Sequence, residues 1–161
     1  MSIGRFEKVS KEQFKKDLKD LLNVEEDLYD NIVIPSRATK GSAGYDFTCP
    51  IDITIKPGEL VKIPSGIRAY IDEGYVLNIY PRSSLGFKYQ LSLANTTGII
   101  DADYYNAQNE GHIIVALVNR GNKGIVIKAG DRFVQGIFFS FFTVDEQEVN
   151  KERIGGFGSS N

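Results

Sequence analysis

The chain has 161 residues, 42% of them hydrophobic, and a formal net charge of −2 from 19 basic and 21 acidic side chains. This length favours one domain with its own core, and the balanced charge excludes a strong overall field for nucleic acid or an anionic membrane. The single cysteine, Cys49, excludes an internal disulfide and a multi-cysteine metal cluster. No apolar run approaches the roughly 20 residues that span a bilayer, and the first residues lack the apolar core of a signal peptide. We therefore expect a soluble, cytoplasmic protein.

Residues 1–30 form a charged segment that we interpret as a helical N-terminal extension. Apolar residues recur at helical intervals on one face, namely Phe14, Leu18, Leu21 and Leu22. This spacing predicts an amphipathic helix over residues 11–22, and Ser10 followed by Gln13 has the pattern of a capping box. A helix this short usually buries its apolar stripe on its own domain; a dedicated partner-binding helix is the alternative.

From about residue 31 the hydrophobic pattern changes to a period of two, which indicates short antiparallel strands over residues 31–145. Such runs, separated by glycine and proline turns, occupy residues 51–55, 67–71, 75–80, 113–118, 125–128 and 133–144. Together with a strand that begins at residues 43–46, these runs bring the count to at least seven, which favours an all-β sandwich or jelly roll. The phenylalanines of the last run, Phe138, Phe139, Phe141 and Phe142, fit either the inner core or a subunit interface.

Several short segments place glycine, charge or hydroxyl groups where a β domain ordinarily has only a turn. They cover residues 43–46, 81–84, 98–104, 130–135 and 153–160. The second segment combines Arg82 with the hydroxyls of Ser83 and Ser84, a set suited to phosphate oxygens. The third puts Asp101 close to Tyr104. The last carries a cation and an aromatic ring on a glycine-rich backbone, which can close over a ligand.

Together and in this order, these segments resemble the five motifs of the trimeric dUTPase family over residues 43–160. The resemblance implies an all-β, distorted jelly roll of the β-clip type that assembles as a homotrimer with active sites at subunit boundaries. It also implies a flexible C-terminal arm over residues 146–161 that covers a neighbour's site. The implied activity is hydrolysis of dUTP to dUMP and pyrophosphate in nucleotide metabolism, which keeps uracil out of DNA.

The catalytic pair implied by the resemblance is Asp101 and Asp46. Hydrolysis at phosphorus needs an in-line water, a base and positive groups that hold the triphosphate. In the family, the residue that matches Asp101 activates the water that attacks the α-phosphorus, and Asp46 lies behind it and organises the site. The expected cofactor, Mg²⁺, would be bound through the phosphates and water, without direct protein ligands.

The resemblance also assigns the substrate contacts. A strand pair from Asn95 to Tyr104 would read the uracil edge with its main chain, and the Tyr104 ring would lie under the deoxyribose, where a 2′-hydroxyl would clash. One methyl group is worth only about 1–3 kcal/mol in an apolar pocket, so a rigid hairpin must exclude thymine. The Phe157 ring would stack on uracil. The expected substrate-binding residues are Arg82, Ser83, Ser84, Asn95, Gly98, Ile100, Tyr104, Gln135, Arg153, Gly156, Phe157, Gly158, Ser159 and Ser160.

Two other functions stay open at this point. A dCTP deaminase of the same fold would suit Ser84, which stands where the dUTPase motif usually has glycine, but its chemistry needs a glutamate where this chain has Ala116. A nucleotide-gated regulatory binding protein, in addition to catalysis, would use residues 1–30 and the extra residues 105–110 as surfaces for a protein partner. His112, the only histidine, is expected to be structural or solvated.

Overall fold

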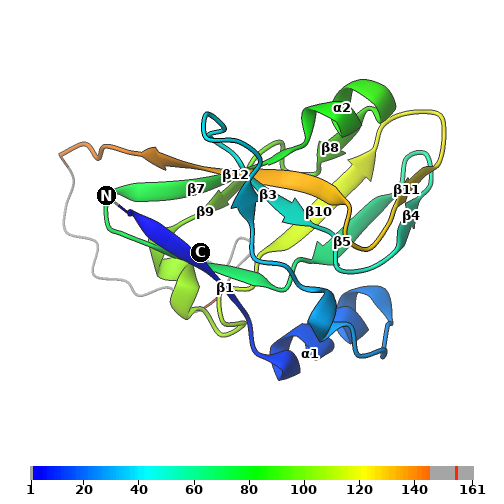
Figure 1. Ribbon diagram of the computed structural model, residues 1–161, viewed down its shortest axis with the longest axis horizontal. Helices are drawn as coiled ribbons and strands as arrows, with labels where there is room; N and C mark the ends of the chain where they lie inside the picture. Colours follow the sequence, from blue (N-terminus) through cyan, green and yellow to red (C-terminus); the bar gives the residue numbers. More distant parts are fainter. Residues whose placement is uncertain (1, 146–154, 156–161) are drawn as a thin grey trace.

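The computed structural model describes residues 2–145 and residue 155 (Figure 1). Its helices are α1 (Lys11–Leu22) and α2 (Ser83–Tyr89), with 3₁₀ turns η1 (Tyr29–Asn31) and η2 (Ala102–Asn106). The strands are β1 (Gly4–Lys8), β2 (Ser36–Arg37), β3 (Tyr45–Thr48), β4 (Ile53–Ile55), β5 (Leu60–Pro64), β6 (Ile67–Ile71), β7 (Tyr75–Pro81), β8 (Leu91–Leu93), β9 (Gly98–Ile100), β10 (Ile114–Asn119), β11 (Ile125–Ile127) and β12 (Arg132–Ser140). The predicted predominance of β-structure is confirmed. Within the described part of the chain, no helix has the length and apolar character needed to cross a membrane.

The predicted helix over residues 11–22 is confirmed as α1, and Ser10 fixes its start. The Ser10 hydroxyl accepts a hydrogen bond from the Gln13 amide at 3.1 Å. The other half of the predicted capping box does not form, because the Gln13 side chain donates to Asp17 at 2.8 Å. The Ser10 amide instead donates to the Glu110 carboxylate at 2.8 Å, so a distant loop completes the cap.

The predicted runs located β4, β6, β7, β10, β11 and β12, but β1, β2, β5 and β8 were missed. All of β1 except Arg5 is half-buried, so the residues show no clean alternation, and the strand is recognisable only from its antiparallel pairing with β6. The last strand is shorter than the predicted run over residues 133–144. It ends at Ser140, opposite Tyr75, where its partner β7 begins.

The strands form several small antiparallel sheets. The largest has the order β2-β3-β12-β7-β9, a second has the order β5-β10-β8, and β1-β6 and β11-β4 are two-stranded. Figure 1 shows β12 running between β3 and β7 through the middle of the molecule, with α1 at the bottom and α2 at the top of the view. This division into short sheets agrees with the distorted jelly roll expected from the sequence.

One buried cluster joins the sheets to the N-terminal segment. Phe47, Leu77 and Phe133 come from the five-stranded sheet, while Phe14 and Leu18 come from α1, and all are at most 1% exposed. Burying each such side chain contributes about 1.5–3 kcal/mol relative to leaving it exposed. The N-terminal helix is therefore part of the core.

The phenylalanine-rich run divides between the core and the surface. The Phe138 ring packs against the core cluster, with the Phe6 and Tyr45 rings at centroid distances of 5.6 and 6.0 Å. Phe141 and Phe142, beyond the end of β12, are 49% and 94% exposed. Neither interpretation, inner core or subunit interface, applies to the whole run, because its first part packs against the core and its last part is exposed.

Candidate active site

Residues 95–104 do not form the strand pair that the resemblance implies. This stretch holds one strand, β9, which pairs with β7, while the preceding strand β8 pairs with β10 in another sheet. Both β8 and β9 are edge strands among the residues that the structure describes. Each therefore has an edge whose N–H and C=O groups are not paired with a further strand. The connecting turn carries Thr96 at a φ of 67°, in the left-handed region.

A pocket of about 520 Å³ lies where β8 and β9 diverge. The predicted site residues that line it are Asn95, Gly98, Ile100, Asp101 and Tyr104. Lys62 of β5 and Ala116 of β10, which are register partners, contribute to the wall. A concave site of this volume suits a small-molecule ligand.

The loop after Asp101 holds the Tyr104 side chain in a fixed place. Tyr104 is only 5% exposed, and its hydroxyl donates to the His112 carbonyl at 2.6 Å and accepts from the Asn109 side-chain amide at 2.9 Å. Gly111 has a φ of 70°, and a Cβ added there would lie 2.7 Å from the Tyr104 carbonyl oxygen. The tight loop therefore requires glycine at this position.

A second group of predicted site residues surrounds Asp46 on β3. The Asp46 carboxylate lies 3.4 Å from Arg82 Nε and 3.2 Å from Arg132 Nη1, and its side chain is 12% exposed. Gln135 is the register partner of Asp46 on β12. A Cβ at Gly44 would lie 2.5 Å from Gln135 Oε1, so glycine allows this close approach. The group combines guanidinium and amide donors, which suit phosphate oxygens.

The remaining predicted residues lie beside this group or outside the described chain. Ser83 and Ser84 follow Arg82 as the first residues of α2, and both are exposed. The residues outside the described part of the chain are Arg153, Gly156, Phe157, Gly158, Ser159 and Ser160.

A single chain does not bring the two groups together. β3 and β9 are separated by β12 and β7, which corresponds to about 14 Å across the sheet at the usual strand spacing. They are also offset along the sheet: Asp46 pairs with Gln135, whereas Ile100, the neighbour of Asp101, aligns through β7 with Phe138. The expected arrangement, with Asp46 directly behind Asp101, is therefore absent from the described residues of one chain.

Two cationic residues near these groups were not among the predicted contacts. Lys62 lines the pocket, but a single lysine on a strand looks like any exposed residue until pairing with β10 places it. Arg132 lies within the segment 130–135 that the sequence singled out. Its charge was therefore a signal that could have been used.

Comparisons with known proteins agree with this architecture. Residues 30–161 match the dUTPase family. A deoxyuridine 5′-triphosphate nucleotidohydrolase of Lactococcus lactis is 45% identical over 132 residues, which cover 80% of this chain and 88% of that protein. A protein of the same name from Desulfitobacterium hafniense is 38% identical over 135 residues, 79% of this chain and 86% of that protein. The crystal structure of a dUTPase from Streptococcus mutans superposes with a TM-score of 0.69 at 34% identity, covering 88% of this chain and 99% of that chain. The chain therefore belongs to the dUTPase family.

Proposed function

We propose that this protein hydrolyses dUTP to dUMP and pyrophosphate. The observation that carries the proposal is the pocket of about 520 Å³ between the diverging strands β8 and β9, which Asp101 and Tyr104 line. Strand edges offer N–H and C=O groups that can form hydrogen bonds with the uracil ring. The Asp101 carboxylate can accept a proton from the attacking water. The names of the relatives from Lactococcus lactis and Desulfitobacterium hafniense support the same reaction.

Asp101 is the proposed general base. It lies between the edge strand β9 and the 3₁₀ turn η2, of which it is the N-cap residue, so regular structure on both sides positions it. Its carboxylate would orient a water molecule and accept the proton as the water attacks the α-phosphorus. A well-placed base contributes about 10²–10⁴ in rate.

The group around Asp46 is proposed to bind the phosphates. Asp46 would act by orienting the guanidinium of Arg82, which lies 3.4 Å away, toward the triphosphate. Ser83 and Ser84 add exposed hydroxyls, and Gln135 adds an amide. Arg153, Ser159 and Ser160 are proposed to reach the distal phosphates from the C-terminal segment, with Phe157 stacked on uracil between Gly156 and Gly158.

Magnesium is proposed to arrive with the nucleotide. Mg²⁺ retains several water ligands and is commonly bound through substrate phosphates with few protein groups. The pocket carboxylate of Asp101 is a hard oxygen donor that suits contact with a water ligand. When bound, the ion would supply charge neutralisation at the phosphates.

We propose a homotrimer in which each active site draws on more than one subunit. The support is the separation of the two groups. Asp101 follows Ile100, which pairs with Leu77 near one end of β7. Asp46 and Arg82 lie at the opposite end of β7, so the groups do not meet among the described residues of one chain. A neighbouring subunit would supply the missing half. The exposed Phe141 and Phe142 rings offer apolar surface of the kind that subunit contacts bury.

Ala116 disfavours the dCTP deaminase alternative. The Ala116 side chain belongs to the pocket wall, opposite Lys62 on β5. A methyl group cannot transfer a proton, so the deaminase glutamate has no substitute at this position. The regulatory-partner alternative and the cytoplasmic location stay predictions.

The test is a nucleotide-release assay with dUTP, dCTP, dTTP and UTP in the presence of magnesium. We expect pyrophosphate and dUMP from dUTP, with little turnover of the other three. Ammonia release from dCTP would instead support deamination. No turnover of dUTP would overturn the proposed function.

A further inference from the structure

The N-terminal segment is hydrogen-bonded to the loop that follows Tyr104. The Ser10 amide at the start of α1 donates to the Glu110 carboxylate at 2.8 Å. The Tyr105 hydroxyl donates to the Glu7 carboxylate of β1 at 2.7 Å. The family match begins only at residue 30, so these contacts join a segment outside the family match to a loop of the candidate active site.

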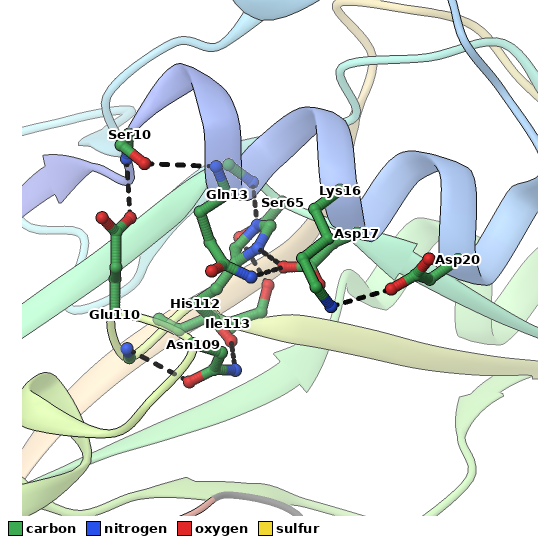
Figure 2. A network of polar contacts seen from close by, with 12 residues as sticks. Ser10, Gln13, Lys16, Asp17, Asp20, Ser65, Asn109, Glu110, His112 and Ile113 are labelled. Carbon is green, nitrogen blue, oxygen red and sulfur yellow. Dashed lines mark hydrogen bonds and ion pairs between the residues drawn. The ribbon is translucent and has the colours of Figure 1, made fainter.

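His112 lies at the centre of this contact and is completely buried (Figure 2). The Gly66 amide donates to His112 Nε2 at 2.8 Å, and Asp17 Oδ2 lies 2.5 Å from His112 Nδ1. Because a backbone amide can only donate, Nε2 carries no proton, and Nδ1 donates its proton to Asp17. Gln13 donates a second hydrogen bond to the same Asp17 oxygen at 2.8 Å. The imidazole is therefore held at both nitrogens, by α1 and by the turn before β6.

The main chain of His112 in turn fixes two parts of the pocket, the Tyr104 side chain and the wall at Ile113. Its carbonyl accepts the hydrogen bond from the Tyr104 hydroxyl at 2.6 Å. The next residue, Ile113, lines the pocket, and its carbonyl accepts from the buried Ser65 hydroxyl at 2.6 Å. A shift of the His112 backbone would therefore move both the partner of Tyr104 and part of the wall.

We propose that Asp17 is a positioning residue for the sugar-binding side of the pocket. Asp17 lies on the N-terminal helix and accepts a hydrogen bond from the His112 imidazole. The main-chain carbonyl of His112 accepts a hydrogen bond from the Tyr104 hydroxyl. This inference rests on the proposed hydrolysis of dUTP, in which the Tyr104 ring lies under the deoxyribose. It assigns to the N-terminal helix a part in the choice of deoxyribose over ribose.

The experiment compares kcat/KM for dUTP with kcat/KM for UTP in the full-length protein and in Asp17→Ala. The ratio of the two constants does not depend on the fraction of folded enzyme, so a purely structural loss leaves it unchanged. We expect Asp17→Ala to lower the ratio about tenfold, the size of discrimination that one fitted contact supplies. Asp17→Asn should keep most of the ratio, because its carbonyl oxygen can still accept the proton of His112 Nδ1.

Asp20→Ala is the matched control on the same helix. Asp20 forms an exposed ion pair with Lys16 at 2.8 Å and is not involved with His112. If Asp17→Ala does not fold, Asp17→Ser replaces it, because the smaller side chain admits a water molecule to the imidazole while removing the direct contact. Equal ratios in the Asp17 variant and in Asp20→Ala would overturn the inference. Absence of dUTP turnover in the unmodified protein would overturn the proposed function instead.

Discussion

The Asp101 carboxylate is the residue on which turnover is expected to depend most. Asparagine at this position has nearly the same shape and can orient water, but it cannot accept a proton. We expect Asp101→Asn to lower kcat by about 10²–10⁴, while binding of a nonhydrolysable dUTP analogue stays close to that of the unmodified enzyme. Steady-state kinetics and calorimetric titration measure the two quantities. An unchanged kcat would eliminate Asp101 as the base.

Cys49 reports on the integrity of the core. It is fully buried, its thiol donates to the Ile51 carbonyl at 3.1 Å, and burial raises its pKa to about 11. At pH 8 only about one thiol in a thousand would be ionised, and the thiolate is the reactive form. We expect a disulfide reagent such as DTNB to react with the native protein very slowly and with one thiol after unfolding in guanidinium chloride. Rapid reaction of the native protein would show that this part of the core opens readily.

The residue contacts differ in how far the sequence could predict them. Asp101 and Tyr104 lie in one short motif, so the sequence alone was enough to predict that they belong to the same site. Asp17 and His112 are 95 positions apart, and neither has a pattern that points to the other. A buried histidine bonded at both nitrogens was within the expected structural role, but its link to Tyr104 depends on tertiary packing.

Helix α1 should make stability depend on acid pH through Asp17. Burial alone would raise the pKa of the Asp17 carboxyl, but hydrogen bonds from His112 and Gln13 outweigh it and hold the pKa below the ordinary value of 3.8. A lowered folded-state pKa stabilises the native state above pH 3.8, and this stabilisation is lost as the pH falls through the folded-state value.

The measurement is the free energy of unfolding between about pH 6 and pH 3, for the unmodified protein and for Asp17→Asn. We expect the unmodified protein to lose more stability over this range than the variant, which has no proton to gain at this position. Parallel curves for the two proteins would contradict the assignment. Asp20→Asn serves as a comparison on the same helix, because the Asp20 carboxylate is exposed and pairs with Lys16, at 2.8 Å, at the surface of α1.

At the level of elements, the alternation of apolar and polar residues predicted strands well where one face of the strand is buried and the other is exposed to solvent. The strand over residues 67–71 was predicted with its observed limits, and its burial alternates. β1 escaped detection because neither of its faces is distinctly buried. The divergence of β8 and β9 could not be read from the sequence, since it depends on which distant strands, β10 and β7, pair with each.

At the scale of the whole molecule, the separation of the two site groups predicts complementation between defective subunits. Asp101→Asn damages the pocket group, and Arg82→Ala damages the phosphate group. If each active site takes these residues from different subunits, trimers refolded from an equal mixture should regain about one quarter of full activity, since that fraction of sites combines two intact halves. Each variant refolded alone is the control. Mixtures no more active than the separate variants would place both groups in one subunit's site.

The all-β class and the single core were predictable because they follow from residue patterning along most of the chain. The spatial assembly of the site was not, since it depends on the sheet order and, in the proposed trimer, on a neighbouring subunit. The segments at residues 43–46, 81–84 and 98–104 were each informative as chemistry, yet only the order β3-β12-β7-β9 shows that the first and last cannot meet within one chain.

The hydrogen bond between the Ser10 amide and the Glu110 carboxylate also has an evolutionary consequence. Neither partner is useful by itself: without the helix, Glu110 has no amide to cap, and without the longer loop, the helix lacks this cap. The two segments should therefore be inherited as a pair. Relatives that lack a counterpart of residues 4–22 are expected to have the shorter loop and no counterpart of His112, and an alignment in which these features vary independently would contradict that expectation.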